Sequence, residues 1–306
     1  MNTGTLGEII SKSRKDKIMN LQSLFNEQIQ TVTKLGGHAS DVWHVRTSQE
    51  DVVVRSSGVS EDSDAPFIFG CNKLFGVELN KTFDLEIINK ELSLVSPIPI
   101  PKCIRKGVID GREFVVVTMM VGEKVDLKNV PSSIAYQFGR DLAEIHSNKF
   151  TKCGNIKGTL RYSLDEFHLR LFGIIEKIIS RFYSDNKVIA DFWETYKDEV
   201  TSLPSPDFAA FIMVDMDSRQ ILSDGTRVTS IVDTEAYVIG PKEFDLIALE
   251  YNFNQETATS FKLGYQSVTP FPNLSLIRNT YRFFYGLMQV KGPIEINDWM
   301  TRPILF

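Results

Sequence analysis

Three carboxylates and one amide follow two apolar runs in the second half of the sequence. In FIMVDMDSRQIL (residues 211–222), Asp215 and Asp217 come after apolar residues and Gln220 follows them; a second apolar run then ends in Asp233. Carboxylates brought together at the ends of neighbouring strands repel one another unless a cation or a phosphate-bound cation lies between them. Carboxylate and amide oxygens are ligands that a hard cation such as Mg²⁺ accepts. These residues therefore indicate metal-assisted phosphate chemistry; the alternative is a polar turn after a buried strand.

A glycine-bearing turn near the start of the chain is suited to hold phosphate groups. The sequence has no Gly-x-x-x-x-Gly-Lys-Ser/Thr motif, which excludes a P-loop. The stretch KLGGHASDVWHV is followed by DVVVRSS, which predicts a turn between two strands and a cation on the next strand. In such an arrangement Gly36, Gly37 and Ser40 present backbone N–H groups to the phosphates, and Arg55 points at them. The alternative is an ordinary Gly-Gly hairpin followed by a surface arginine.

An acidic side chain on the helix after this strand would hold Arg55 in place by ion pairing. The helical pattern of residues 78–92 places Glu86 among apolar neighbours, and we expect Glu86 to form this ion pair. Glu78 and Glu91 lie on the same predicted helix and are alternatives. A glutamate on a solvated helix face would have no such role.

The hydrophobic periodicity changes along the chain and predicts two lobes. Residues 1–30 are typical of a polar leader and a short amphipathic helix, and residues 31–120 of β-rich runs with one inserted helix. Beyond them amphipathic helices dominate, apart from the β-rich segment that carries the acidic residues. The sequence thus predicts an α+β protein with a small β-rich N-terminal lobe (1–120) and a larger, mainly helical C-terminal lobe (121–306). We expect the two lobes to join near residues 118–123.

The order of these pieces resembles the aminoglycoside phosphotransferase and choline kinase-like family, which has a bilobal protein-kinase-like fold. The family's catalytic segment has the pattern His-Gly-Asp-x-x-x-x-Asn, and MVDMDSRQIL is similar to it. SIVDTEAYVIGPKEFDLIAL resembles the metal-binding segment that follows, and VTMMVGEKV resembles the connection between the lobes. FGRDLAEIHS resembles the helix whose histidine, here His146, packs beneath the catalytic loop. The resemblance covers about residues 31–250 in the right order.

The resemblance implies a small-molecule kinase that transfers the γ-phosphoryl group of ATP or GTP to a substrate hydroxyl with the help of Mg²⁺. Asp215 falls on the position of the catalytic base, and Gln220 and Asp233 fall on the positions of the metal ligands. Met119 and Val121 fall in the segment that contacts the nucleotide base. In this class of reaction, positioning and charge neutralisation supply most of the catalysis.

Two positions depart from the family pattern. Met213 stands where the family has histidine, so its side chain cannot donate the hydrogen bonds that brace the catalytic loop; Gln220 stands in place of asparagine and carries its amide one methylene further out. Glutamine keeps the amide oxygen that a hard cation accepts, so the loop could retract to accommodate the longer side chain, or Asp217 could take over as a ligand. If the metal site is lost, the chain is a pseudokinase, which binds nucleotide without transferring phosphate. A kinase for protein substrates is a further alternative, disfavoured because the sequence lacks an Ala-Pro-Glu segment.

Composition and charge narrow the class of partner. The 306 residues carry a net charge of −5, whereas a nucleic-acid-binding protein usually has a basic excess. No apolar run is long enough to span a membrane, and the first residues lack the apolar core of a signal peptide. The 3 cysteines are too widely spaced for a disulfide framework, so we expect a cytoplasmic protein. The acidic excess of residues 121–306 suits a cationic acceptor.

Overall fold

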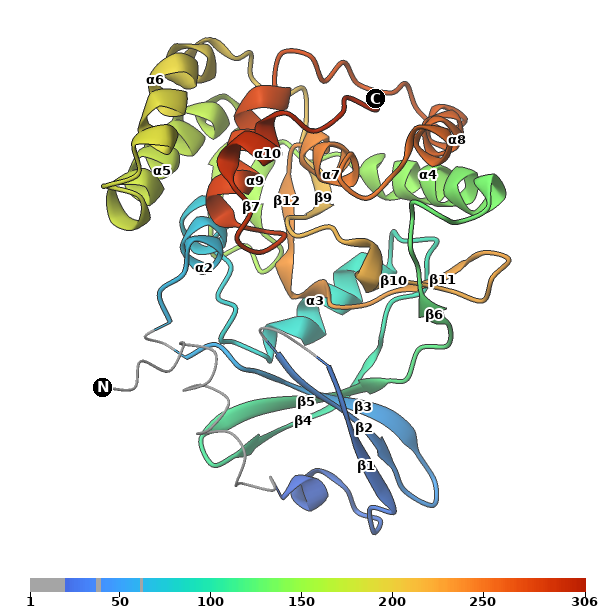
Figure 1. Cartoon of the computed structure of the whole chain (residues 1–306). Coiled ribbons are helices and arrows are strands. Elements are labelled where there is room, and N and C mark those ends of the chain that lie inside the picture. Colours follow the sequence, from blue (N-terminus) through green and yellow to red (C-terminus); the bar gives the residue numbers. More distant parts are fainter. Residues whose placement is uncertain (1–19, 37–39, 61–62) are drawn as a thin grey trace, which may run out of the picture.

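The smaller lobe is built on a five-stranded antiparallel sheet (Figure 1). The computed structural model describes residues 20–36, 40–60 and 63–306. The sheet has the order β1-β2-β3-β5-β4, and its strands are β1 (Thr31–Leu35), β2 (Ser40–Arg46), β3 (Asp51–Ser57), β4 (Cys103–Ile109) and β5 (Arg112–Thr118). Valines dominate β3 and β5, because β-branched side chains pack well in strands that are paired on both sides. The predicted β-rich lobe is confirmed.

A short 3₁₀ turn, Leu21–Leu24, covers one face of this sheet. Leu21 and Leu24 are buried in a cluster with Val54 of the sheet. The sequence predicts a short amphipathic helix toward the end of residues 1–30. In the described part of this range, from residue 20 onward, the structure has only the 3₁₀ turn. The rest of the leader, residues 1–19, lies outside the described residues.

The helix of the smaller lobe is shorter than the predicted helix of residues 78–92. The observed helix is α3 (Asp84–Ser93). Before it, α2 (Pro66–Gly70) continues into one π-helical turn (Cys71–Phe75), which ends at Gly76 in the left-handed region with a φ of 72°. Because glycine adopts this conformation without steric cost, the chain turns away at Gly76 before α3 begins.

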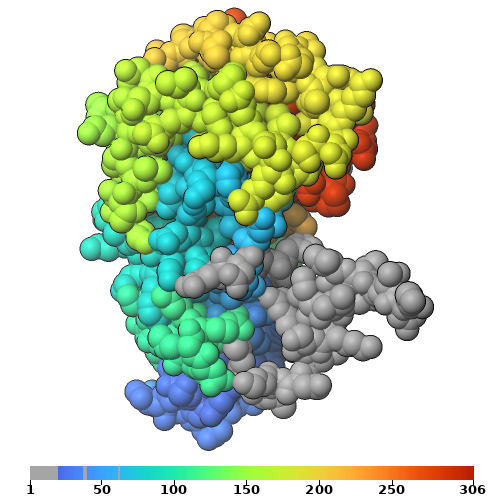
Figure 2. Space-filling view, turned by 90° about the vertical axis from the view of Figure 1, so that its left-hand side faces the viewer, coloured from blue at the N-terminus to red at the C-terminus, as the bar shows by residue number. Residues whose placement is uncertain are grey.

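The segment that contains α2 packs against the larger lobe, although it precedes α3 in the sequence. Cys71, Leu74 and Phe75 are fully buried in the core formed with the C-terminal helices. Helix α2 lies beside α5 (Phe167–Phe182) and α9 (Arg278–Met288). Figure 2 shows this light-blue segment directly against the yellow-green surface of the larger lobe. This segment of the first 120 residues therefore contributes side chains to the core of the larger lobe.

The larger lobe is mainly helical, as predicted. Its other helices are α4 (Ser132–His146), α6 (Lys187–Ser202), α7 (Glu243–Leu249), α8 (Gln255–Gln266) and α10 (Ile296–Met300). Two small sheets have the orders β11-β10-β6 and β8-β7-β12-β9. Their strands are β6 (Glu123–Lys124), β7 (Lys152–Asn155), β8 (Arg161–Ser163), β9 (Ala210–Met213), β10 (Ile221–Ser223), β11 (Val228–Ile231) and β12 (Tyr237–Gly240). Within the described ranges, no helix has the length and apolar character needed to cross a membrane.

Helices α4 and α8 cross in direct backbone contact. A Cβ atom on Gly264 of α8 would lie 1.8 Å from the carbonyl oxygen of Tyr136 in α4, and one on Gly139 would lie 2.0 Å from the carbonyl oxygen of Phe261. Only glycine fits at such points, because any side chain would overlap a backbone that cannot move aside. Through this crossing α8 fixes the position of α4, whose last residue, His146, contacts Asp245.

His168 on α5 reports on the packing of the larger lobe. Its side chain is buried, and its Nε2 atom lies 2.9 Å from the hydroxyl oxygen of Tyr281 on α9. Burial lowers the pKa of His168 to about 4, from an ordinary value of about 6.5. As the pH falls below about 6.5 the unfolded chain binds a proton at this residue, whereas the folded chain does not until about pH 4. The free energy of unfolding therefore falls as the pH is lowered from about 6.5 to about 4.

We therefore expect His168→Gln to make the protein less sensitive to acid. Between about pH 7 and about pH 5, the free energy of unfolding should fall by about 1–2 kcal/mol more in the wild type than in the variant. Urea denaturation of both proteins at each pH measures this difference, because the titration of all other groups cancels in the comparison. Parallel pH profiles would contradict the prediction.

Candidate active site

The acidic residues singled out in the sequence meet where β9 ends and β12 begins. These strands pair antiparallel, with Met213 opposite Tyr237. Asp215 follows β9 and Asp233 precedes β12, so the pairing brings both carboxylates to the same edge of the sheet. They are close enough for the charge of Asp233 to raise the pKa of Asp215, an effect second only to burial. We call residues 215–220 the acidic loop.

Asp215 is partly enclosed, and one of its carboxylate oxygens lacks a partner. Its Oδ2 atom accepts a hydrogen bond from Nε2 of Gln220 at 3.0 Å. Its Oδ1 atom is buried and receives no hydrogen bond from the described residues. Burial, together with the charge of Asp233, raises the pKa of Asp215 to about 7. A carboxylate with a pKa near neutral pH is suited to accept a proton from a hydroxyl group.

Gln220 belongs to the hydrogen-bond network of the acidic loop itself. Its Oε1 atom accepts the backbone N–H of Asp217 at 2.9 Å, which leaves Nε2 to donate to Asp215. A backbone N–H can bond only to the oxygen of the amide, so chemistry settles this orientation. The longer side chain of glutamine folds back over the 3₁₀ turn Ser218–Gln220 and closes a capping box. This geometry differs from the predicted metal-ligand role, for which the amide oxygen would have to face the cation.

Asp217 is neutralised by two cationic side chains. Its Oδ1 atom lies 2.9 Å from Nε of Arg219, and its Oδ2 atom lies 2.7 Å from Nζ of Lys291. Burial opposes ionisation, but these two cations hold the pKa of Asp217 well below its usual range. Because both oxygens are engaged, Asp217 supports the acidic loop and does not take the place of a metal ligand. This corrects the alternative raised from the sequence.

The acidic loop is braced through the backbone of Met213. Oδ1 of Asp245 accepts the backbone N–H of Met213 at 2.9 Å, and Oδ2 of Asp245 lies 3.2 Å from Nε2 of His146. Nδ1 of His146 lies 3.0 Å from the hydroxyl of Tyr265. Burial lowers the pKa of His146 to about 3, so the ring is neutral at physiological pH. His146 packs beneath the loop as expected, and the methionine at residue 213 does not abolish the brace.

Arg55 of β3 reaches from the smaller lobe to two acids of the segment before β12. Its buried guanidinium forms ion pairs with Asp233 and Glu235, the latter at 2.5 Å. Burial alone would lower the pKa of Arg55, but the carboxylates of Glu235 and Asp233 raise it. Burial and the charge of Asp233 also raise the pKa of Glu235, and the guanidinium of Arg55 opposes this rise. Arg55 therefore lies beside the acidic residues that the sequence singled out.

The predicted ion pair between Arg55 and Glu86 is wrong. Glu86 lies in the first turn of α3 and pairs with Lys106 of β4 at the surface. Within the described structure neither Glu78 nor Glu91 pairs with Arg55. In this first turn Leu85 packs onto the sheet against Val53 and Val115, whereas the side chain of Glu86 lies at the surface beside β4.

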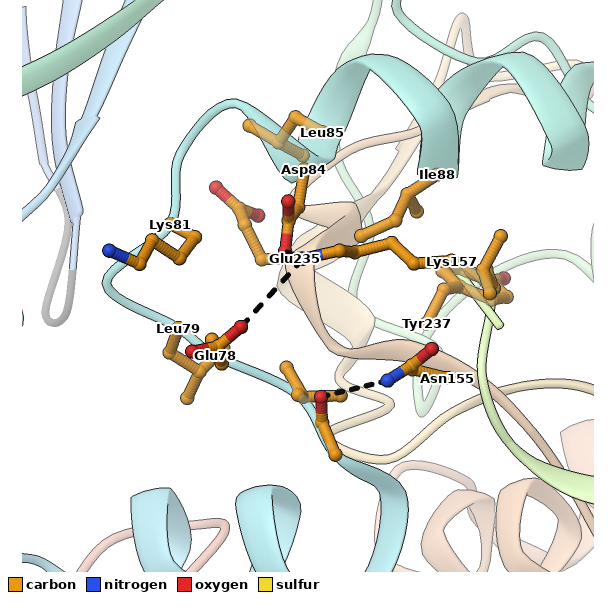
Figure 3. A pocket seen from close by; sticks show the side chains of 13 residues that line it. Glu78, Leu79, Lys81, Asp84, Leu85, Ile88, Asn155, Lys157, Glu235 and Tyr237 are labelled. Atoms are coloured by element: carbon orange, nitrogen blue, oxygen red, sulfur yellow. Dashed lines mark hydrogen bonds and ion pairs between the residues drawn. The ribbon is translucent and has the colours of Figure 1, made fainter. Parts of the chain in front are cut away.

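A small pocket, with a cavity volume of about 20 Å³, lies beside α3 and has Glu235 in its wall (Figure 3). At this pocket Nζ of Lys157 is 2.8 Å from Asp84 and 3.7 Å from Glu78. Lys157 belongs to the connection between β7 and β8, so these ion pairs join the larger lobe to the segment that leads into α3. These ion pairs thus help to position α3. The residues that line the pocket do not include those of the acidic loop.

The residues predicted to contact the nucleotide lie in two connecting segments. Gly36 is exposed after the end of β1, and Ser40 is the first residue of β2, whereas Gly37 lies outside the described residues. Met119 and Val121 follow β5 in the connection between the lobes, where 40% and 78% of their surfaces are exposed. Exposed apolar side chains at this connection are available to a flat ring, and their role stays a prediction.

Solved structures of phosphotransferases align with nearly the whole chain. Macrolide 2'-phosphotransferase MphH from Brachybacterium faecium aligns over 94% of this chain and 97% of its own, with 12% identity and a TM-score of 0.58. A thermostable mutant of aminoglycoside phosphotransferase APH(4)-Ia, in ternary complex with AMP-PNP and hygromycin B, aligns over 88% of both chains with 13% identity and a TM-score of 0.62. The GDP complex of wild-type aminoglycoside 2'-phosphotransferase-IIIa aligns over 92% of both chains with 15% identity and a TM-score of 0.59.

This chain has the aminoglycoside phosphotransferase fold. The resemblance predicted from the sequence is thus confirmed at the level of the fold, including the bilobal protein-kinase-like arrangement. By sequence alone, no family model and no curated protein matches the chain.

Asp233, next to Asp215, fits a divalent cation that is held jointly with phosphate. The side chain of Asp233 is 50% exposed, so a cation can reach it from solvent. In the same part of the chain, no three His, Cys, Asp or Glu side chains are grouped so that they alone would hold a metal. Mg²⁺ commonly takes one or two carboxylates and completes its coordination with phosphate and water. The donor set therefore fits Mg²⁺ together with nucleotide phosphates.

The sequence patterns do not reveal two residues that support the acidic loop. Asn252 accepts the backbone N–H of Ser218 at 3.3 Å and donates to the carbonyl oxygen of Met216 at 3.3 Å. Lys291 forms the ion pair with Asp217 described above. No motif marks either residue, because each contacts the loop only through the packing of the C-terminal helices.

Proposed function

We propose that the chain is a small-molecule kinase that transfers the γ-phosphoryl group of ATP or GTP to a substrate hydroxyl. The observation that carries the proposal is Asp215, whose pKa near 7 arises from burial and from the neighbouring Asp233. Arg55 from the smaller lobe lies beside this pair. Phosphoryl transfer requires a proton acceptor, a metal ligand and a phosphate-binding cation, and these residues supply such groups. The phosphotransferase fold supports the same class of reaction.

Each of these residues has one task in the proposed reaction. Asp215 accepts the proton of the acceptor hydroxyl at its unpartnered Oδ1 atom, while that hydroxyl oxygen bonds to the γ-phosphorus. The bond from this phosphorus to the β–γ bridging oxygen breaks, and ADP or GDP leaves. Asp233 would hold Mg²⁺, and Arg55 pairs with the phosphates. Bound Mg²⁺ supplies charge neutralisation on the phosphate oxygens. Charged groups stabilise a transition state most when they are positioned before the reaction. The hydrogen bond from Met213 to Asp245 braces the acidic loop, and burial holds Arg55, so both are positioned in advance.

The nucleotide lies between the lobes in this proposal. The turn of Gly36, Gly37 and Ser40 covers the phosphates with backbone N–H groups, and Met119 and Val121 contact the base. Solved neighbours hold AMP-PNP in one case and GDP in another, which supports a purine nucleotide and leaves both ATP and GTP as donors.

The proposed acceptor is a small molecule with a free hydroxyl group. The solved neighbours include phosphotransferases of macrolides, of aminoglycosides and of spectinomycin. The acidic excess of residues 121–306 favours a cationic acceptor, because a negative field raises the local concentration of cations.

Asp233→Asn tests the proposal. The wild type should bind ATP or GTP at least about 10-fold more tightly with Mg²⁺ than with EDTA, and the variant should lose most of this difference, because an amide lacks the charge that attracts the cation. Calorimetric titration with and without Mg²⁺ measures both values. Asp191→Asn on the exposed face of α6 is the matched control and should retain the Mg²⁺ dependence. A wild type that shows neither Mg²⁺-dependent nucleotide binding nor transfer to aminoglycosides, macrolides or choline contradicts the proposal.

The alternative function is that of a pseudokinase, a nucleotide-binding module without phosphoryl transfer. The observation that favours it is the amide oxygen of Gln220, which bonds to the backbone N–H of Asp217 and does not face a cation. Nucleotide binding that is independent of Mg²⁺, combined with no hydrolysis of ATP or GTP, would decide for this alternative.

A further inference from the structure

A lysine that follows α9 lies beneath the acidic loop. The side chain of Lys291 is only 14% exposed. Its Nζ atom lies 2.7 Å from Oδ2 of Asp217, 3.0 Å from the carbonyl oxygen of Met216 and 3.2 Å from Oδ1 of Asn252. An ammonium group has three protons to donate, and burying it is costly unless each proton finds an acceptor. Here three acceptors surround it, so the lysine is built into the support of the loop.

A continuous series of contacts leads from Lys291 to the carboxylate of Asp215. Lys291 holds the side chain of Asp217, and the backbone N–H of Asp217 donates to Oε1 of Gln220 at 2.9 Å. The other end of that amide donates to Oδ2 of Asp215 at 3.0 Å. Each contact sets the orientation of the next group. The direction of the Asp215 carboxylate therefore depends on the position of Asp217.

Arg219 also pairs with Asp217, but the two cations are not equivalent. The side chain of Arg219 is 61% exposed, whereas that of Lys291 is mostly buried. Exposed ion pairs are screened by water and contribute little to positioning. Lys291 also donates to the backbone carbonyl oxygen of Met216, whereas the hydrogen bonds from the side chain of Arg219 to described residues all go to Asp217.

We propose that Lys291 is a positioning residue that orients Asp215 for proton transfer through Asp217 and Gln220. The expected effect of Lys291 on kcat rests on the proposed kinase function. Its expected effect on the order of the acidic loop rests on the loop geometry alone. A lysine that only stabilises the fold would neither protect the loop amides selectively nor change kcat.

The experiment compares Lys291→Met and Lys291→Arg with the wild type. Lys177→Met on the exposed face of α5 is the matched control. Hydrogen exchange measured by mass spectrometry reports on the backbone amides of residues 214–222, and Mg²⁺-dependent ATP hydrolysis reports on turnover, with water in place of the acceptor. In Lys291→Met the loop amides should exchange at least about 10-fold faster, while the amides of α4 and α8 keep their rates.

The turnover measurement separates orientation from binding. In Lys291→Met kcat should fall by about 10- to 100-fold with KM for ATP unchanged, because a small displacement of a reacting group is costly whereas nucleotide contacts persist. Lys291→Arg keeps a cationic donor and should recover part of kcat and most of the loop protection, and it serves as the test if Lys291→Met does not fold. The Lys177→Met control should match the wild type.

Two results would overturn the proposal. Unchanged exchange of the loop amides in Lys291→Met would do so whether or not the wild type hydrolyses ATP. An equal rise in exchange across the loop, α4 and α8, with kcat unchanged, would show a purely stabilising lysine. A wild type that neither binds nor hydrolyses ATP would instead count against the proposed function, and the exchange data would still decide the role of Lys291.

Discussion

Asp215→Asn is expected to lower kcat for phosphoryl transfer by about 10²- to 10⁴-fold while the affinity for nucleotide stays within about twofold, because an amide cannot accept the hydroxyl proton. The substitution preserves the shape of the side chain, so the contact with Gln220 persists through the amide oxygen. Steady-state kinetics and calorimetric titration measure the two effects separately. Because Asp217 lies in the same loop but is neutralised by cations, Asp217→Asn should cost less turnover than Asp215→Asn.

The pH dependence of the wild type provides an independent check on Asp215. Its pKa near 7 predicts that kcat/KM falls about tenfold per pH unit below about pH 7, since the base must be deprotonated to act. The charge of Asp233 is one cause of the raised pKa, so binding of Mg²⁺ there should shift the corresponding fall in kcat to lower pH. In Asp215→Asn neither kcat/KM nor kcat should fall in this way as the pH is lowered. A pH profile shared by the variant and the wild type would exclude Asp215 as the proton acceptor.

Arg55→Met is expected to weaken nucleotide binding by about 10- to 100-fold, because it removes charge-assisted hydrogen bonds to the phosphates. It should also lower the free energy of unfolding by about 2 kcal/mol, because Asp233 and Glu235 lose the buried cation that pairs with both. Calorimetric titration and urea denaturation measure the two effects. The long apolar side chain of methionine retains much of the packing of arginine.

The double variant Arg55→Met with Glu235→Gln separates the two effects. It removes an acid that the single variant leaves unpaired, so it should recover much of the lost stability and none of the lost nucleotide affinity. Unchanged nucleotide affinity in Arg55→Met would remove Arg55 from the phosphate site. Full recovery of affinity in the double variant would show that Arg55 acts only through stability.

The hydrophobic pattern by itself determines most of the strands and helices and their order, although not the extent of the leader helix or of α3. The valine-rich runs of β3 and β5 and the short apolar runs of β9 and β12 are local signals that need no distant partner. Because β9 and β12 are separated by a short β-rich segment, the approach of Asp215 and Asp233 also follows from the sequence. The bilobal fold and this pair of acids could therefore be predicted.

Only the tertiary structure decides which side chains are paired across these elements. The partners of Arg55 are Asp233 and Glu235, not Glu86, whose side chain pairs with Lys106 of β4. Lys291 reaches Asp217 only because the end of α9 packs beneath the acidic loop. An ion pair or hydrogen bond forms within a few ångströms, and that separation depends on the relative placement of distant elements, which a local pattern of apolar and polar residues does not encode.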